Sequence, residues 1–309
     1  SQLEDAFENG VSIDSAAITG VGGIDVKLNP VSSLLSVLPW RPHAGRVVSV
    51  FCNIANLDGT PYVCDPMVML ENQVNKLGAL GLKAQVATEC EFYVFKDDGE
   101  TELVPFDTAD YCACSPSDKC ENLRRDVILS LEDMGLKPIS SHHERGMGQN
   151  EIDFESADPS AAARNFIMFK NAVKNVCALN GTCASFMPRP LDGYPGSGLH
   201  LSITLSGKNA SASAAAFAEG VMRRYKEITC FANPTPNSYA RIKKNYKIAY
   251  GVNRGSAMRI FGDNVVQLRT PDSTCNIFTV LSLVFAAGRE GIENNYTLRG
   301  EGEATDYMF

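Results

Sequence analysis

Runs of β-branched and aromatic residues with polar residues at every second position predict several strands along the chain. The longest covers residues 83–95, where Val86, Tyr93 and Phe95 stand among charged residues. Residues 11–65 are predicted to form short strands and loops that end near a turn at Asp58-Gly59. The individual strands predicted in this way are 47–54, 83–95, 150–155, 199–205, 252–260 and 265–270.

Apolar residues spaced three and four apart predict helices between these strands. Two helices have recognisable ends, because Asp158 is a favourable N-cap and Gly135 and Gly181 follow the last periodic residues. Strands and helices do not alternate regularly, so the pattern favours an α+β fold over a regular βαβ arrangement. The predicted helices are 66–82, 119–134, 158–180, 210–229 and 276–287.

The composition is that of an ordinary globular protein, since 44% of the 309 residues are hydrophobic and 21% are charged. No apolar run reaches the roughly 18 residues that a membrane span needs, so we expect no membrane partner. The net charge of −8 argues against nucleic acid as a partner. Ten scattered cysteines without a CxxC pair, and an acidic N-terminal segment unlike a signal peptide, indicate reduced thiols and a cytoplasmic protein.

Polar side chains gather on one face of each of four predicted strands, because residues two apart on a strand point the same way. For any one strand alone, a solvated face explains them equally well. Several carboxylates and a histidine together indicate a funnel of hard ligands that suits Mg²⁺ or Mn²⁺. The four sets are Glu89 and Glu91; Glu151, Asp153 and Glu155; His200, Ser202 and Thr204; and Gln267 and Arg269.

Four arginines follow these strands in the last quarter of the chain: Arg241, Arg254, Arg259 and Arg269. Guanidinium groups bind phosphates and carboxylates in a bidentate manner. A metal ion combined with arginines is the equipment of phosphoryl transfer. The candidate chemistry therefore involves a phosphorylated substrate.

Seven segments occur in order between about residues 11 and 293, and together they resemble the motifs of the glutamine synthetase superfamily. The resemblance rests on the whole set, because a single Gly-Ser-Gly-x-His would mean little. The segments are Glu89-Cys90-Glu91-Phe92; His142-His143-Glu144 with Gly148-Gln149-Asn150-Glu151; Phe186-Met187-Pro188-Arg189-Pro190; Gly196-Ser197-Gly198-Leu199-His200; Asn233-Pro234-Thr235-Pro236-Asn237-Ser238-Tyr239 with Arg241; Asn253-Arg254-Gly255-Ser256 with Arg259; and Arg269-Thr270-Pro271-Asp272.

The resemblance implies an α+β fold with two parts. Residues 1–60 would form a partial N-terminal β-grasp-like domain, and residues 61–309 a barrel-like catalytic domain whose C-terminal end looks truncated. Family members assemble as homo-oligomeric rings with active sites between subunits. In the family, Asp25 would help to deprotonate ammonium in a neighbour's site, although a plain surface aspartate is the alternative reading.

The implied reaction is the ATP-dependent ligation of glutamate to ammonia through a γ-glutamyl phosphate. One alternative is γ-glutamylation of an organic amine or polyamine. The other is a catalytically weak, ring-forming relative with a structural or regulatory role. ATP and Mg²⁺, or Mn²⁺, are the implied cofactors.

The resemblance also assigns roles to individual residues. One metal would be held by Glu91, Glu144 and Glu151, and a second, on the ATP side, by Glu89, His200 and Gln267. Glutamate would be bound by Arg241 and Arg269, with Gly196 near its amino group. Arg254 and Arg259 would stabilise the transferred phosphoryl group, and together with Ser202 and Thr204 they would line the ATP site.

Four departures from the family pattern lie in the second half of the chain. Gln267 stands where the second metal usually has a glutamate, and Ser202 where many members have a histidine that meets ATP. Val265 replaces an arginine, and the segment between Arg241 and Arg254 is short and lacks the usual Glu-Ala-Pro. A neutral amide is a weaker ligand for a hard cation, so the resemblance implies reduced activity.

Overall fold

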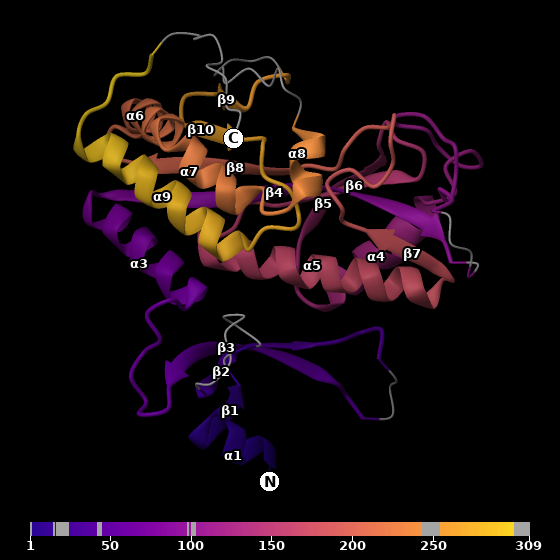
Figure 1. Cartoon of the computed structure of the whole chain (residues 1–309), viewed down its shortest axis with the longest axis horizontal. Coiled ribbons are helices and arrows are strands. Elements are labelled where there is room, and N and C mark those ends of the chain that lie inside the picture. The colour runs from indigo at the N-terminus through magenta and orange to yellow at the C-terminus, as the bar shows by residue number, and fades with distance from the viewer. Residues whose placement is uncertain are drawn as a thin grey trace.

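The computed structural model describes residues 2–14, 16, 25–41, 45–97, 99, 103–242 and 254–299. Its centre is a seven-stranded antiparallel sheet with the order β5-β6-β4-β8-β10-β9, and β7 pairs with β4 outside that path (Figure 1). The strands are β4 (Leu82–Lys96), β5 (Pro138–His143), β6 (Gln149–Phe154), β7 (Thr182–Ser185), β8 (Leu199–Gly207), β9 (Met258–Phe261) and β10 (Val265–Leu268).

This sheet is open. β5 and β9 are its two end strands, and no pairing between them occurs in the described ranges. The expectation of a barrel-like catalytic domain is therefore wrong. Closure of a barrel depends on strand tilt and register stagger, which the alternation of side chains along one strand does not reveal.

Helices cover one face of the sheet. Phe92 of β4 is buried and its ring lies 5.9 Å from that of Phe169 on the longest helix. None of the helices in the described part is long and apolar enough to cross a bilayer. The helices are α3 (Pro66–Ala79), α4 (Glu121–Asp133), α5 (Pro159–Leu179), α6 (Ala210–Arg223), α7 (Tyr225–Ala232), α8 (Pro236–Arg241) and α9 (Ile277–Glu293).

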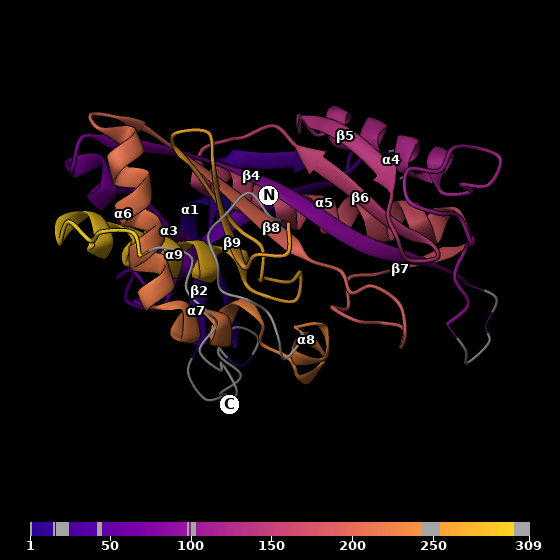
Figure 2. The same ribbon diagram turned by 90° about the horizontal axis from the view of Figure 1, so that it is seen from above.

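The other face of the sheet is polar and turned away from these helices. On β4 the alternate residues Val86, Cys90 and Phe92 are buried in the core, so Glu89 and Glu91 between them point to the opposite side. Seen from above, β4, β6 and β8 cross in front of α5 (Figure 2). The candidate chemistry thus lies on a sheet face that the long helix does not cover.

Most predicted elements are confirmed, with two exceptions in the second half. The helix expected over 210–229 is two helices that meet at Arg224, whose side chain binds Glu290 of α9 at 2.9 and 3.0 Å. The strand expected over 252–260 is confined to β9, because residues 254–257 form a turn and a bend while 252 and 253 lie outside the described residues. The short elements β5, β7 and α8 carry too little periodicity to be predicted.

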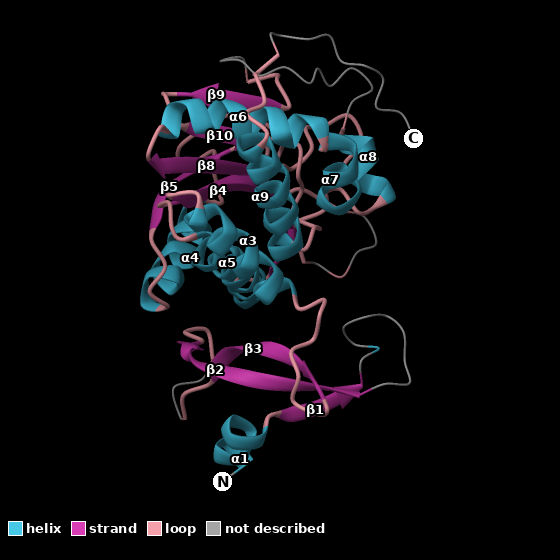
Figure 3. Cartoon of the chain, turned by 90° about the vertical axis from the view of Figure 1, so that its left-hand side faces the viewer, coloured by secondary structure: helices cyan, strands magenta, loops and turns pink. Residues whose placement is uncertain are grey.

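The N-terminal part is a three-stranded antiparallel sheet in the order β1-β2-β3, preceded by a helix. In Figures 1 and 3 it lies on the far side of α3 and α5 from the main sheet. The predicted strand 47–54 is confirmed, whereas the β-grasp-like character of this part stays a prediction. Its elements are α1 (Gln2–Asn9), β1 (Val11–Asp14), β2 (Asp25–Val37) and β3 (Val48–Asn56).

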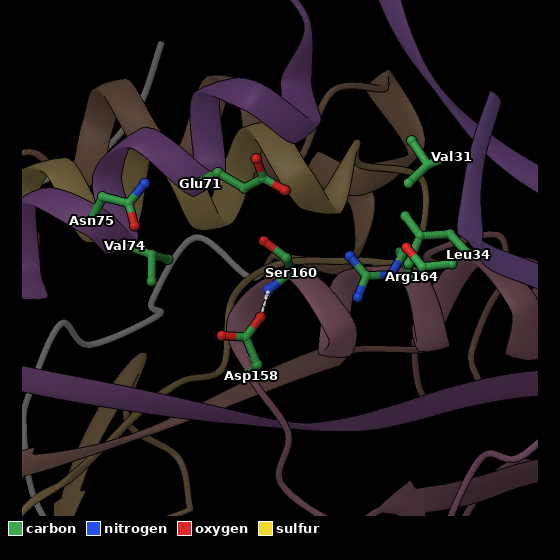
Figure 4. Close-up of a pocket in the computed structure, with 9 residues that line it drawn as sticks. Val31, Leu34, Glu71, Val74, Asn75, Asp158, Ser160 and Arg164 are labelled. Atoms are coloured by element: carbon green, nitrogen blue, oxygen red, sulfur yellow. Dashed lines mark hydrogen bonds between the residues drawn. The ribbon is translucent and has the colours of Figure 1, made fainter. Parts of the chain in front are cut away.

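A pocket of about 430 Å³ separates the N-terminal sheet from the helices behind it (Figure 4). Val31 and Leu34 of β2 form one wall, and Glu71 of α3 and Arg164 of α5 line the opposite side. None of the residues expected in the active site lines this pocket. It therefore belongs to the contact between the two sheets and their helices, not to the polar face.

Candidate active site

The register of the sheet brings the polar residues of four strands into two adjacent rows. In the first row, Glu91 of β4 lies opposite Glu151 of β6, which lies opposite His142 of β5. In the second row, Glu89 lies opposite Asp153 on one side and His200 of β8 on the other. Side chains opposite one another on neighbouring strands have Cβ atoms about 5 Å apart, so these groups are in reach of one another.

A group of three carboxylates forms around the first row. Glu144 is the first residue of the loop between β5 and β6, and its N–H donates to the Gln149 carbonyl at 2.7 Å. Its Oε1 lies 3.0 Å from His142 Nε2, and Glu151 Oε2 lies 3.8 Å from the same nitrogen. Glu91 Oε2 accepts hydrogen bonds from the Gly198 N–H at 3.0 Å and Gln149 Nε2 at 3.1 Å.

These carboxylates repel one another in a buried setting. Burial, then the charges of Asp153 and Glu91, raise the pKa of Glu151, and burial likewise raises the pKa of Glu91. Burial also opposes ionisation of Glu144, but hydrogen bonds from His142 and the Arg145 N–H outweigh it and lower its pKa. Three acidic groups with so little compensating positive charge fit a divalent cation of the Mg²⁺ or Mn²⁺ type.

The second row is organised differently, because its polar groups satisfy one another. Gln267 Nε2 donates to Glu89 Oε1 at 2.8 Å, and Glu89 Oε2 lies 2.9 Å from His200 Nδ1. Burial opposes ionisation of Glu89, but the hydrogen bond and charge of His200 prevail and lower its pKa. Gln267 is neutral and only 2% exposed, and its N–H group faces Glu89. It therefore offers no ligand oxygen on the side of Glu89. Glu89, Glu151 and His200 each place one ligand atom within 4.8 Å of the others, as metal ligands do. Both oxygens of Glu89 are nevertheless engaged, one by His200 and one by the Gln267 amide, and Glu151 belongs to the first row. This set therefore does not fit a second cation of its own.

Three arginines face the same region. Arg259 Nη1 and Arg269 Nη1 donate to Gln267 Oε1 at 3.3 and 3.1 Å. Arg241 Nη2 donates to the carbonyls of Thr270 and, at 2.9 Å, Pro271. Each of the three guanidiniums also has a buried Nε without a hydrogen-bond partner among the described residues. An anion beside them would find positive charge already positioned.

A glycine loop closes the site beside Arg241. A Cβ on Gly196 would lie 2.5 Å from Arg241 Cγ and 2.6 Å from the Pro188 carbonyl oxygen, so only glycine fits there. The loop is held by the Tyr93 hydroxyl, which donates to the Pro195 carbonyl at 2.6 Å, and by the Ser197 N–H, which donates to the Pro188 carbonyl at 2.8 Å.

Comparisons with known proteins agree with this geometry. The model of the family described as glutamine synthetase, catalytic domain, matches residues 63–307. The glutamine synthetase of Clostridium saccharobutylicum is 36% identical over 98% of this chain and 74% of its own length. That of Methanosarcina mazei is 36% identical over 95% of this chain and 71% of its own. The chain belongs to the glutamine synthetase family.

Solved structures of the family share the fold. The structure titled "Apo GmaS without ligand" superposes with a TM-score of 0.87 at 27% identity, covering 98% of this chain and 75% of that one. A Plasmodium falciparum glutamine synthetase superposes with a TM-score of 0.83 at 21% identity, over 94% and 67% of the two chains. The second likeness shows the fold alone.

Not every residue expected from the family pattern lies beside the carboxylates and the three arginines. Arg254 is exposed in the turn before β9, and Thr204 is half-buried one row beyond Ser202, opposite Gln85 and Val265. Asp25 is exposed at the start of β2 in the N-terminal sheet. The shortened segment after Arg241 lies largely outside the described residues. Glu155 follows the end of β6, is exposed, and binds the exposed Lys137 at 3.0 Å.

Gln149 is a site residue that reasoning from the sequence missed. Its Nε2 donates to Glu91 and, at 3.3 Å, to the Gly196 carbonyl, so it joins the carboxylate group to the glycine loop. The available signal was its position in the Gly148-Gln149-Asn150-Glu151 motif, two residues before Glu151 on the same strand face.

A second missed feature is a buried polar network behind Glu144. His143 Nε2 lies 2.8 Å from Asp107 Oδ1, and its Nδ1 lies 2.6 Å from the Glu144 carbonyl. Asp107, Asp118 and His143 lie as close together as metal ligands, but Arg124 donates to both oxygens of Asp118. With Asp107 also accepting from the Gly148 and Lys119 N–H groups, this network is structural.

Proposed function

We propose that this chain ligates glutamate to ammonia with ATP, as glutamine synthetases do. The supporting observation is that Glu91 lies opposite Glu151, that Glu144 and Glu151 both approach His142, and that three arginines with unpaired Nε atoms lie nearby, in a chain of this family. In this reaction the γ-carboxylate of glutamate takes the γ-phosphoryl group of ATP, giving ADP and γ-glutamyl phosphate. The nitrogen of ammonia then attacks the acyl carbon, a proton leaves, and inorganic phosphate departs.

The proposed cation site consists of Glu91, Glu144 and Glu151. A divalent cation bound there would supply positive charge for the oxygens of the reacting carboxylate and phosphate. Gln149 and the Gly198 N–H hold one Glu91 oxygen in place, and His142 orients Glu144. These contacts fix the carboxylates before the cation binds, which lowers the cost of ordering them.

The proposed glutamate site is formed by Arg241 and Arg269, with Gly196 beside the amino end. Gly196 approaches the aliphatic Cγ and Cδ atoms of Arg241, so the loop backbone lies against this side chain, which supports the assignment. On the nucleotide side, Arg259 and Arg254 would bind the transferred phosphoryl group, with Ser202 and Thr204 farther along β8. We propose a rate below that of relatives that carry a glutamate at the position of Gln267.

A second candidate substrate is an organic amine or polyamine in place of ammonia. The observation that favours it is the fit to structures titled GmaS, one of which is described as an ADP complex and superposes with a TM-score of 0.85. The reaction class is unchanged, because only the nucleophile differs.

The test is release of inorganic phosphate from ATP with Mg²⁺, glutamate and a panel of amines. We expect release to require glutamate and to be highest with ammonia. The Glu144→Ala variant should lose activity by on the order of a hundredfold or more, because it removes a carboxylate that touches the cation. Mn²⁺ binding by this variant should weaken in parallel.

The matched control is Glu155→Ala, which removes an exposed carboxylate from the end of the same sheet outside the site. Its activity should stay near that of the unchanged chain. If phosphate release is faster with an organic amine than with ammonia, the organic amine is the preferred substrate. If no amine gives glutamate-dependent phosphate release, the remaining hypothesis is a catalytically weak relative with a structural or regulatory role.

Three further assignments belong to this proposal. The domain boundary is placed near residue 60, between the N-terminal sheet and α3. A homo-oligomeric ring is proposed because β2, which begins at Asp25, lies on the far side of α3 and α5 from the main sheet (Figure 3). A cytoplasmic location is proposed because exposed thiols such as Cys112, Cys114 and Cys183 are free, which suits a reducing compartment.

A further inference from the structure

The amide of Gln267 makes four hydrogen bonds, which is its full capacity. Its Nε2 donates to Glu89 Oε1 at 2.8 Å and to Ser202 Oγ at 3.0 Å. Its Oε1 accepts from Arg259 Nη1 at 3.3 Å and Arg269 Nη1 at 3.1 Å. Amide nitrogen and oxygen each have two such positions, so none is left for a metal ion.

The orientation of this amide is decided by its neighbours. A carboxylate accepts hydrogen bonds and a guanidinium only donates them, so Nε2 must face Glu89 and Oε1 must face the two arginines. Turning the amide over would set oxygen against oxygen at Glu89 and N–H groups against N–H groups at Arg259 and Arg269. Gln267 therefore cannot offer its oxygen to a cation near Glu89 without losing this arrangement.

The local charge also opposes a second cation. The charged side chains that hydrogen-bond to Gln267 are one carboxylate, Glu89, and two guanidiniums, Arg259 and Arg269, so this hydrogen-bonded group carries a net positive charge. A divalent cation here would add to that charge in a buried place, where repulsion is weakly screened. A glutamate at position 267 would instead place two carboxylates together, an arrangement that needs a cation.

Two departures from the family pattern meet in one hydrogen bond. Ser202 and Gln267 lie directly opposite each other on β8 and β10, and Ser202 Oγ accepts the second amide hydrogen. The amide at position 267 is thus matched by a small hydrogen-bond acceptor, the Ser202 hydroxyl, on the neighbouring strand. Both substitutions serve the same bridge between Glu89 and the arginines.

We propose that the Gln267 amide takes the place of the second divalent cation, so that the chain binds one such cation per subunit in the absence of nucleotide. This inference deepens the proposed function and rests on its assignment of Glu91, Glu144 and Glu151 to the first cation. Gln267 bridges Glu89 to Arg259 and Arg269 and keeps these charged groups in position without a metal.

The test is the number of Mn²⁺ ions bound by the full chain without nucleotide, measured from the paramagnetic resonance signal of free Mn²⁺. The unchanged chain should bind one ion. Gln267→Glu should bind two, with the second at least roughly tenfold tighter than any second ion on the unchanged chain, because a direct ligand outweighs an outer-sphere partner. Two ions of similar affinity on the unchanged chain would overturn the inference.

Gln85→Glu is the matched control, since it adds the same carboxylate on the same face of β4 four residues before Glu89. It should leave the count at one. A second ion in this variant would show that added charge alone explains the result and would overturn the inference.

A second variant covers the possibility that Gln267→Glu does not fold without metal. Glu89→Gln in the otherwise unchanged chain should still bind one Mn²⁺, because Glu89 is not needed for the first ion. If the unchanged chain bound two Mn²⁺ ions and Glu89→Gln bound only one, the inference would be overturned. One ion per chain supports the inference even if no amine supports phosphate release, so its outcome is separate from that of the proposed function.

Discussion

At the scale of single residues, the environment of each acidic group decides its charge. Asp107 is buried, yet His143 and the N–H groups of Lys119 and Ala109 donate to it. Burial opposes ionisation, but these partners prevail and lower the pKa of Asp107 to about 2. Glu151 has acidic neighbours instead, and its pKa moves the other way. The neighbours of each carboxylate thereby distinguish Asp107 from Glu151, although both are buried.

Asp107 should make stability depend on pH in the acid range. Its native pKa lies below the ordinary value of 3.8, so its contribution is present above about pH 4 and is lost as pH falls toward 2. Relative to Asp107→Asn, the unchanged chain should therefore gain about 2 kcal/mol in free energy of unfolding between pH 2 and pH 6. Urea unfolding at both pH values measures the difference.

The control for this measurement is Asp133→Asn at the exposed end of α4. That change should alter the free energy of unfolding by about 0.5 kcal/mol or less at either pH. If the Asp107→Asn difference were the same at pH 2 and pH 6, the assigned hydrogen bonds to Asp107 would be wrong.

At the scale of elements, α6 and α9 approach closely enough to require glycine where they cross. A Cβ on Gly291 would lie 2.0 Å from the Ala216 carbonyl oxygen, and one on Gly220 would lie 2.1 Å from that of Ala287. Backbone atoms cannot move aside as a flexible side chain does. The contact fixes α9 against α6, which packs on β8, and so supports the strand that carries His200.

Gly291→Ala should destabilise the chain although alanine is the better helix former. The added methyl group meets backbone at 2.0 Å, so the expected cost is about 1–3 kcal/mol of unfolding free energy. Gly78→Ala in α3 is the control, because a Cβ there meets nothing within 4 Å and should stabilise by about 0.5 kcal/mol. Thermal unfolding of both variants provides the comparison, and equal shifts would contradict the packing argument.

At the scale of the whole molecule, two layers of helix and sheet keep the N-terminal strands away from the polar face. β2 faces α3 and α5 through Val31 and Leu34 (Figure 4), and the main sheet lies on the other side of these helices (Figure 1). Glu89 and Glu91 alternate with the buried Cys90 and Phe92 of β4, so they point away from the helices. Asp25 on β2 is therefore not positioned to act on its own chain's carboxylates. A role for Asp25 in the reaction requires a neighbouring subunit.

Asp25→Asn and Glu144→Ala chains should complement each other when assembled together. Each variant alone should be inactive with ammonia, whereas a random 1:1 mixture should recover roughly a quarter of the sites, since these pair an intact Asp25 with intact carboxylates. Phosphate release after joint refolding measures the recovery, and light scattering should show an oligomer.

The control mixture pairs Glu144→Ala chains with chains that carry both substitutions, and it should recover nothing. A stable, fully active monomer would contradict the shared site. So would full activity of Asp25→Asn with ammonia.

The sequence by itself determined the α+β class, the main strands and helices, and the ordered motifs that place the chain in its family. These features depend on side chains two, three or four residues apart, which the chain shows directly. The assignment of Glu91, Glu144 and Glu151 to one cation stays a proposal, which rests on the motif in which each lies.

Only the tertiary structure decided the open sheet, the break at Arg224 and the state of Gln267. Glu89 and Gln267 are 178 residues apart in the chain, and the direction of the amide depends on Arg259 and Arg269 as well. The helix break depends in the same way on Glu290 of α9. Such contacts are set by register and packing between distant segments, and local periodicity carries no information about them.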